Sequence, residues 1–242
     1  MPYRRLPNTD QARVRALTTI VEVGESASDV LALPYSLNML TKAGNLLRIF
    51  KQKHTYYKIC YQKQSKASKK YQIVVRHARL YVSHFVQVLN LAIQREEIPA
   101  ADKSYYDLEP ENYNVPDISS DASLYDWGQK IIDGEHKRTS YGGSPIYSPT
   151  IAKVKVFFDL FKDGYENQKN LQRLTATSLE EVASMRNEVD ELLLEIWNSI
   201  EAKNKDIESI EERCDACRKY GVVYYYRSSE KRKLSISTKL EL

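Results

Sequence analysis

Hydrophobic residues recur alternately three and four positions apart over residues 179–217. This spacing puts them on one face of a helix, where equally long partners have to cover them. Covering one aliphatic side chain stabilises a fold by about 1.5–3 kcal/mol, so the pattern predicts a long helix packed against other long helices. Ten of the twelve positions on this face are apolar or Cys: Leu179, Val182, Arg186, Val189, Leu193, Ile196, Ile200, Lys203, Ile207, Ile210, Cys214 and Cys217.

The first hundred residues show the same helical spacing three more times. Asn8 is the expected N-cap of a first helix, with Gln11 as its capping-box partner and Gly24 at its end. A second apolar stripe covers 36–61 and a third covers 71–92.

The polar segment 62–70 between these two stripes leaves two alternatives. It is the turn of a helical hairpin, or one continuous helix runs through Ser65–Ser68, because nothing there is a strong helix breaker.

Prolines punctuate residues 98–147, which we expect to be irregular apart from a short helix capped by Asp121. Ser148-Pro149 then begins a helix, and a cap at Thr177 or Ser178 begins the next. The sequence therefore predicts an acidic long helical hairpin over 148–220.

The resulting fold class is all-α, an up-down bundle of long antiparallel helical hairpins with a short C-terminal strand. The strand is expected at the β-prone residues 222–227, paired with Tyr3–Leu6 or with Tyr113–Ile118, because a lone strand is not stable. The expected parts of this one bundle are 1–97 (first helix and basic hairpin), 98–147 (irregular), 148–220 (acidic hairpin) and 221–242 (strand and basic tail).

Charge is distributed unevenly along the chain, although the net charge is only +4. Residues 30–95 contain no acid and twelve Lys or Arg, whereas 177–215 contain twelve acids and four bases. Cations interleaved with aromatic rings are typical of nucleic-acid surfaces. The other interpretations are that the basic segment packs against the acidic one or that its lysines lie on a solvated face. The predicted nucleic-acid or partner surface, called here the basic surface, consists of Lys51, Lys53, Lys58, Lys63, Lys69, Lys70, Arg76, Arg79, Tyr56 and Tyr71.

Candidate metal and catalytic residues are few. Cys214 and Cys217 form a CxxC pair without the second pair that a zinc site needs, so we interpret them as core residues. His77 and His84 lie seven residues apart on a helix with no acid of its own and fit the edge of a helix seam better than a catalytic pair. We expect no catalytic residues, no metal and no cofactor.

Four segments resemble an uncharacterised family of bacterial (Bacteroidetes-type) helical-bundle proteins. They are the opening MPYRRLPNTDQARVRAL, then ARLYVSHFVQVLNLAI (78–93), SPTIAKVKV (148–156) and YGVVYYYR (220–227). The resemblance implies a cytosolic-type helical bundle and no known activity. The cysteine pair and the tail after residue 227 are not part of the pattern.

The leading functional hypothesis is a non-enzymatic structural or protein-interaction bundle that associates with a protein partner or with itself. The N-terminus has no apolar signal segment and no apolar run reaches about 20 residues, so we expect a cytoplasmic location and no membrane contact. The first alternative is nucleic-acid binding through 42–95. The second is a small-ligand binder or enzyme with a pocket among Tyr165, Gln168, Gln172 and His77.

Overall fold

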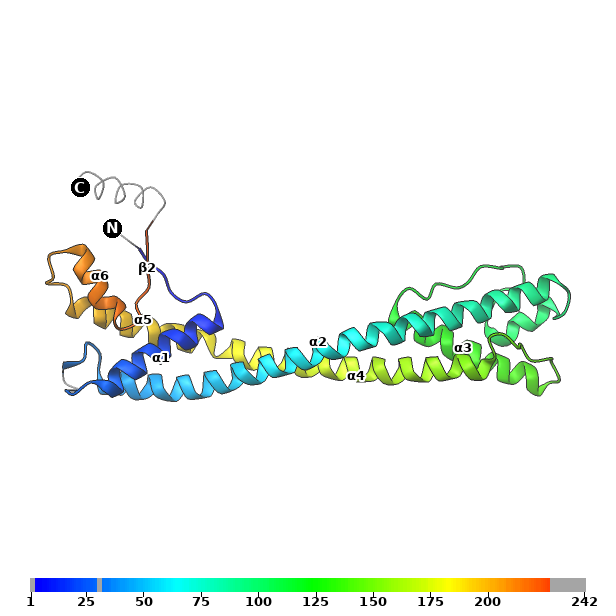
Figure 1. The fold of residues 1–242 in the computed structure, drawn as a ribbon, viewed down its shortest axis with the longest axis horizontal. Helices are drawn as coiled ribbons and strands as arrows, with labels where there is room; N and C mark the ends of the chain where they lie inside the picture. Colours follow the sequence, from blue (N-terminus) through cyan, green and yellow to red (C-terminus); the bar gives the residue numbers. More distant parts are fainter. Residues whose placement is uncertain (1–2, 30–31, 227–242) are drawn as a thin grey trace. The chain divides into compact units, whose positions relative to one another are not determined.

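The computed structural model describes residues 3–29 and 32–226, which are mainly helical (Figure 1). The predicted all-α bundle of long helices with a small β element is confirmed. The elements are β1 (Tyr3–Arg4), α1 (Asp10–Ser26), α2 (Leu37–Gln94), the 3-10 helix η2 (Ala100–Tyr106), α3 (Asp121–Ser140), α4 (Ile151–Ser184), α5 (Arg186–Lys203), α6 (Ile210–Arg218) and β2 (Tyr224–Tyr225).

The chain forms two compact units, and the two longest helices contribute to both. Unit 1 contains the described residues up to 59 and from 176 onward, and unit 2 contains 60–175. The boundaries of the four predicted segments do not coincide with these units, because α2 and α4 each cross from one unit to the other.

The predicted turn between 62 and 70 does not exist, since α2 is one continuous helix of 58 residues. No Gly or Pro occurs between Gly44 and Pro99, and the Lys, Gln and Ala residues of the polar segment favour helix. Of the two alternatives, the continuous helix is therefore correct and the hairpin within 1–97 is wrong.

The predicted hairpin over 148–220 is wrong for a similar reason. Thr177 and Ser178 lie inside α4 rather than at a cap, and Ser178 is buried. Only Met185 separates α4 from α5. Helix α5 ends at Lys203, well before Cys217, the end of the predicted stripe. Directly after this end, the Asn204 side chain donates a hydrogen bond to the carbonyl of Ile200 (2.8 Å).

Helix α1 begins one residue later than predicted. Thr9 is its N-cap, and the Thr9 hydroxyl accepts a hydrogen bond from the amide of Ala12 (3.2 Å). The Ser120 hydroxyl caps α3 in the same way, so Asp121 is the first residue of that helix.

In unit 1 the middle of the predicted apolar stripe is covered. Helices α1 and α2 pack against it through Leu17, Ile20 and Phe50, all with no exposed surface. Leu179 and Ile210, toward the ends of the stripe, are more than one third exposed. The covered stripe residues of α4 and α5 are Val182, Val189, Leu193, Ile196 and Ile200.

Four charged side chains fix α1 against α5. The guanidinium of Arg13 binds both carboxylate oxygens of Asp190 (2.8 and 2.7 Å), and that of Arg186 binds both oxygens of Asp10 (2.9 and 2.8 Å). Arg13 also pairs with Asp10 at 3.3 Å, which links the two bidentate pairs. Bidentate Arg–carboxylate bonds are strong and directional, so they set the register of these helices.

Unit 2 packs α3 with the second half of α2 and the first half of α4. Tyr71 lies against Phe161, and Tyr81 stacks on Phe157 with ring centroids 4.2 Å apart. The contacts show that α2 and α4 are antiparallel, because residue numbers rise along one helix as they fall along the other.

A buried ionic network orders the segment that we expected to be irregular. Glu135, which has no exposed surface, accepts hydrogen bonds from Tyr106, from Arg138 (3.0 Å) and from the amide of Ile146 (3.1 Å). Arg138 donates a further bond to the carbonyl of Ser144 (2.6 Å). Because each charge is partnered, the network joins η2, α3 and the loop before α4 without an unpaired buried charge.

Strand β1 at the N-terminus pairs with strand β2 near the C-terminus, which confirms the first of the two predicted alternatives. Tyr3 lies opposite Tyr225 and Arg4 opposite Tyr224 in an antiparallel arrangement. Residue 227, the end of the predicted strand, lies outside the described residues.

Replacing a covered stripe residue tests the core of unit 1. We expect Leu193→Ala to lower the free energy of unfolding by about 2–5 kcal/mol, because it leaves a cavity. Leu194, 38% exposed on the same helix, is the matched control, and Leu194→Ala should change stability by about 0.5 kcal/mol or less. Urea denaturation followed by circular dichroism measures both, and equal losses would contradict the assignment of the buried face.

The ion pairs between α1 and α5 predict a pH-dependent stability. Burial raises the pKa of Asp10, but the hydrogen bond and charge of Arg186, with the charge of Arg13, outweigh it, so the pKa lies below the ordinary 3.8. A depressed pKa means that the stabilisation is present above about pH 4 and is lost as the pH falls through the lower folded value.

We therefore expect Asp10→Asn to cost about 1.5–3 kcal/mol at neutral pH and progressively less as the pH falls below the ordinary pKa of 3.8. Denaturation midpoints between neutral pH and pH 3 measure the difference. Glu22→Gln, at an exposed position of α1, is the control and should show no such dependence. A difference independent of pH would show that the Asp10 charge is not responsible.

Candidate functional site

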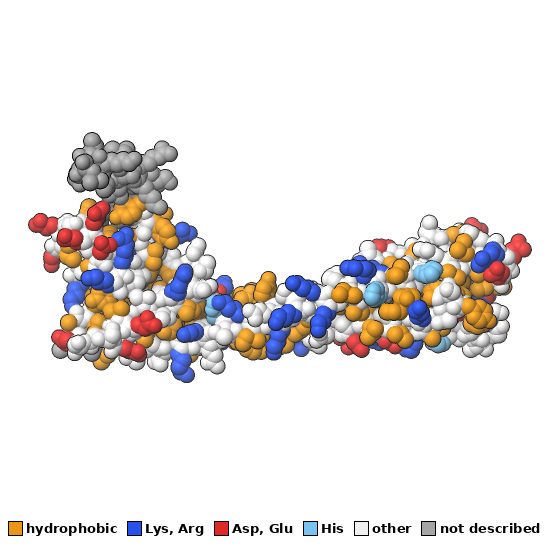
Figure 2. Space-filling model, in the orientation of Figure 1, with side chains coloured by type: hydrophobic (Ala, Val, Ile, Leu, Met, Phe, Trp, Pro, Cys, Tyr) orange, Lys and Arg blue, Asp and Glu red, His pale blue; other side chains and the backbone are white. Residues whose placement is uncertain are grey.

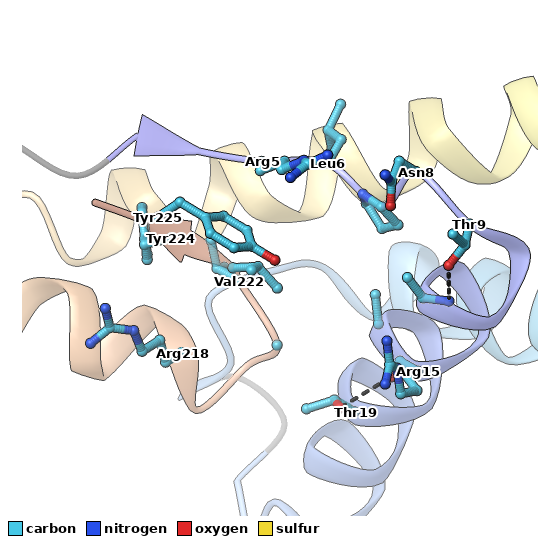
Figure 3. A pocket seen from close by; sticks show the side chains of 15 residues that line it. Arg5, Leu6, Asn8, Thr9, Arg15, Thr19, Arg218, Val222, Tyr224 and Tyr225 are labelled. Carbon is cyan, nitrogen blue, oxygen red and sulfur yellow. Dashed lines mark hydrogen bonds between the residues drawn. The ribbon is translucent and has the colours of Figure 1, made fainter. Parts of the chain in front are cut away.

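A surface groove with a volume of about 670 Å³ lies in unit 1 (Figure 3). The segment 5–9 and α1 form one side of it, and the chain from the end of α6 through β2 forms the other. We call it the arginine groove, and it is lined by Arg5, Leu6, Pro7, Asn8, Thr9, Ala12, Arg15, Ala16, Thr19, Arg218, Gly221, Val222, Val223, Tyr224 and Tyr225.

A glycine turn brings the C-terminal wall of the groove against α1. Gly221 has φ +85°, a left-handed conformation that glycine adopts without strain. A Cβ at this position would lie 3.2 Å from Cβ of Thr19, so the contact also needs the small residue. Val222 is buried beyond the turn, and the carbonyl of Val223 accepts a hydrogen bond from the amide of Arg5 (3.0 Å).

Hydrogen bonds and burial anchor the same wall. The Tyr224 hydroxyl donates to the carboxylate of Glu201 (2.6 Å), which also pairs with Arg4 (2.9 Å).

Cys214 and Cys217 are free and almost fully buried, as expected for core residues, and burial raises the pKa of both thiols. The described residues contain no group of three His, Cys, Asp or Glu side chains that could hold a metal ion.

The charge of the groove is entirely positive. Arg5 lies 5.5 Å from the ring centroid of Tyr225, and Arg218 pairs with Asp215 outside the groove. Arg15 is exposed and has no carboxylate within 4 Å among the described residues. None of the fifteen lining residues is Asp or Glu, so the groove attracts anionic groups.

The basic surface is only partly available to a partner. Lys53 pairs with Glu181 (3.2 Å), and Arg79 donates to the carbonyl of Ser119 and to Asp121 (3.3 Å). Tyr71 is 6% exposed and belongs to the core of unit 2. The remaining seven residues are exposed, with Lys51, Tyr56 and Lys58 in unit 1 and Lys63, Lys69, Lys70 and Arg76 in unit 2.

The exposed cations of α2 keep their charge largely uncompensated. No carboxylate lies within 4 Å of the six exposed Lys and Arg of the basic surface in the part of the chain that the structure describes. On the face drawn in Figure 2, Lys and Arg side chains alternate with exposed hydrophobic ones. Among the described residues, Lys53–Glu181 is the one ion pair between α2 and the acidic segment 177–215. Packing of these two segments therefore does not neutralise the positive charge of α2.

A second, smaller cavity of about 180 Å³ lies within unit 2. It brings together Tyr165, Gln168 and Gln172, as the small-ligand hypothesis predicted, but not His77, whose ring instead meets the edge of Phe157. We call it the glutamine pocket, and it is lined by Ser68, Tyr71, Gln72, Asp121, Tyr165, Gln168, Lys169 and Gln172.

The Asp121 carboxylate and the Tyr71 hydroxyl of the glutamine pocket already have hydrogen-bond partners. The Tyr71 hydroxyl donates to Asp121 (2.8 Å), and burial with this bond raises the pKa of Tyr71. Lys169 lies 4.3 Å from the ring centroid of Tyr165. By contrast, Gln168 is 7% exposed and its Oε1 has no hydrogen-bond partner among the described residues.

Comparisons of the sequence with protein-family models and with curated proteins, and of the fold with solved structures, found no match. The resemblance to the helical-bundle family therefore stays a prediction. Among the described helices, none combines the length and the apolar character that crossing a membrane requires.

Proposed function

We propose that the protein is a non-enzymatic protein-interaction bundle whose arginine groove binds an acidic, partly apolar peptide segment of a protein partner. The observation that supports it is the composition of the groove, which has three arginines and no acid. Three free, buried cysteines are typical of a reducing compartment, so we propose the cytoplasm as its location.

The groove offers both kinds of contact that a peptide of this chemistry needs. Leu6, Pro7 and Val223 provide apolar surface within it, on which Leu or Val side chains can be buried. The arginines supply planar donors that match carboxylate geometry and remain charged at every physiological pH. Tyr225, 43% exposed, adds an aromatic surface beside Arg5.

A labelled acidic peptide tests this proposal directly. The probe is a fluorescein-labelled peptide of about twelve residues, Glu with Leu at every third position, and the control peptide has Lys in place of Glu. We expect saturable binding of the acidic peptide to the full chain, weakened about tenfold, equivalent to about 1.4 kcal/mol, by Arg15→Glu. Fluorescence anisotropy measures the affinities.

Arg48→Glu is the matched control because Arg48 is exposed on α2 and does not line the groove. It makes the same charge change and should leave the peptide affinity nearly unaltered. Equal binding of both peptides, or equal weakening by the two substitutions, would contradict the proposal.

Nucleic-acid binding by α2 is the second candidate function. It is supported by six exposed cations on a helix that contains no acid, and none of these cations has a carboxylate partner in the part of the chain that is described. Contacts to phosphates release counterions, so affinity that depends on these cations falls steeply with salt.

For this candidate we expect a single-stranded DNA of about 20 nucleotides to bind at about 50 mM salt and to lose affinity steeply by about 200 mM. The double change Lys69→Glu with Lys70→Glu should abolish binding, whereas Lys205→Glu with Lys219→Glu, of equal charge, should weaken it far less. Retention that does not change with salt would remove nucleic-acid binding as a function.

A further inference from the structure

We infer that the glutamine pocket of unit 2 binds one small, neutral, polyhydroxylated molecule, of the size of a monosaccharide or cyclic polyol. This site is independent of the arginine groove, which lies in unit 1. Three observations on the lining residues carry the inference.

The first observation is the unsatisfied carbonyl of Gln168. Its Oε1 is buried without a hydrogen-bond partner, and the residue lines the pocket. Buried polar atoms are nearly always partnered, because an unpartnered one loses its bonds to water without replacement. Rotation of the Gln168 side chain toward the pocket would let a ligand hydroxyl supply the missing donor.

The second observation concerns charge. Asp121 accepts hydrogen bonds from Tyr71 and Arg79, and Lys169 lies over the ring of Tyr165. Since the Asp121 carboxylate is engaged within the protein, the groups left for a ligand beside the exposed Lys169 are amides and hydroxyls. These come from Ser68, Gln72, Gln168 and Gln172.

Amides and hydroxyls both donate and accept hydrogen bonds. A ligand that matches them carries groups with the same dual capacity, as the hydroxyls of a sugar or polyol do. A simple anion offers acceptors alone and a simple ammonium ion donors alone, so each leaves part of the lining unpaired.

The third observation is size. A cavity of about 150 Å³ accommodates a benzene molecule, so the volume of about 180 Å³ suits a single six-membered ring with substituents. The pocket is smaller than the sites of drug-sized molecules, which are usually about 300–1,000 Å³.

The test is an NMR titration of the full chain that observes the side-chain amide resonances of glutamine. The probes are myo-inositol and D-glucose for the proposed class, with sodium phosphate and ethylammonium chloride for the charged alternatives. We expect the two neutral probes to shift the Gln168 side-chain signal saturably, together with those of Gln72 and Gln172. The signal of Gln62, which is exposed on α2 and outside the pocket, should stay unchanged.

Three variants, one of them a control, separate binding from folding. Gln168→Leu, which identifies the Gln168 resonance, should abolish the shifts of the other pocket glutamines. The exposed Gln172→Ala should weaken binding with an unaltered circular dichroism spectrum, and Gln62→Leu should bind as the unaltered chain does.

Three outcomes would overturn the inference. The first is the absence of any saturable shift, which means that the pocket holds water only. The second is an equal or larger response to phosphate or ethylammonium, and the third is full binding by a folded Gln168→Leu variant. The peptide titration of the arginine groove is unaffected by any of them, so the two proposals fail separately.

Discussion

The apolar side of α2 has to be covered along most of its length, and both units form around that requirement. Phe50 is fully buried in unit 1, and Val82, Phe85 and Leu89 are fully buried in unit 2. Helices α4 and α5 supply the opposing apolar side chains, helped by α1 in unit 1 and α3 in unit 2. Because no Gly or Pro interrupts α2 after Gly44, the same helix serves both cores.

This arrangement decides which surfaces are available for function. A helix without acids, buried along one side, presents its cations on the other, and most of them stay unpaired in the described structure. The arginine groove arises separately, where a glycine turn brings the strand of the C-terminal segment against α1. The glutamine pocket arises where polar residues of α2 and α4 face each other beside the start of α3.

Periodicity predicted the buried faces well and the turns poorly. Apolar residues at helical spacing lie on one face of a helix, and that face is the one that becomes buried. The buried residues that the spacing predicted include Val189, Leu193, Ile196 and Ile200. The cap expected near Thr177 is a local signal, and the continuous packing of α4 overrides it.

Sites that join distant segments were predicted only in part. Gln168 and Gln172 lie four residues apart on one helix, so spacing identified them, whereas Asp121 reaches the same pocket from another helix. The bond between Tyr106 and Glu135 spans 29 residues, and no pattern within the sequence links them. The three arginines of the groove are likewise far apart in the sequence, and they are brought together by the pairing of β1 with β2 and by the packing of the Gly221 turn against α1.

Both units depend on α2 being one uninterrupted helix, and a distance measured across its polar segment 62–70 tests this most directly. Spin labels at exposed positions 62 and 76, in a chain whose three cysteines are replaced by Ala, can be measured by pulsed electron paramagnetic resonance. A continuous helix predicts a backbone separation of about 21 Å, from 14 residues at about 1.5 Å each. A hairpin turning at 65–68, with helix axes about 10 Å apart, would bring the positions to about 12 Å and would contradict the account.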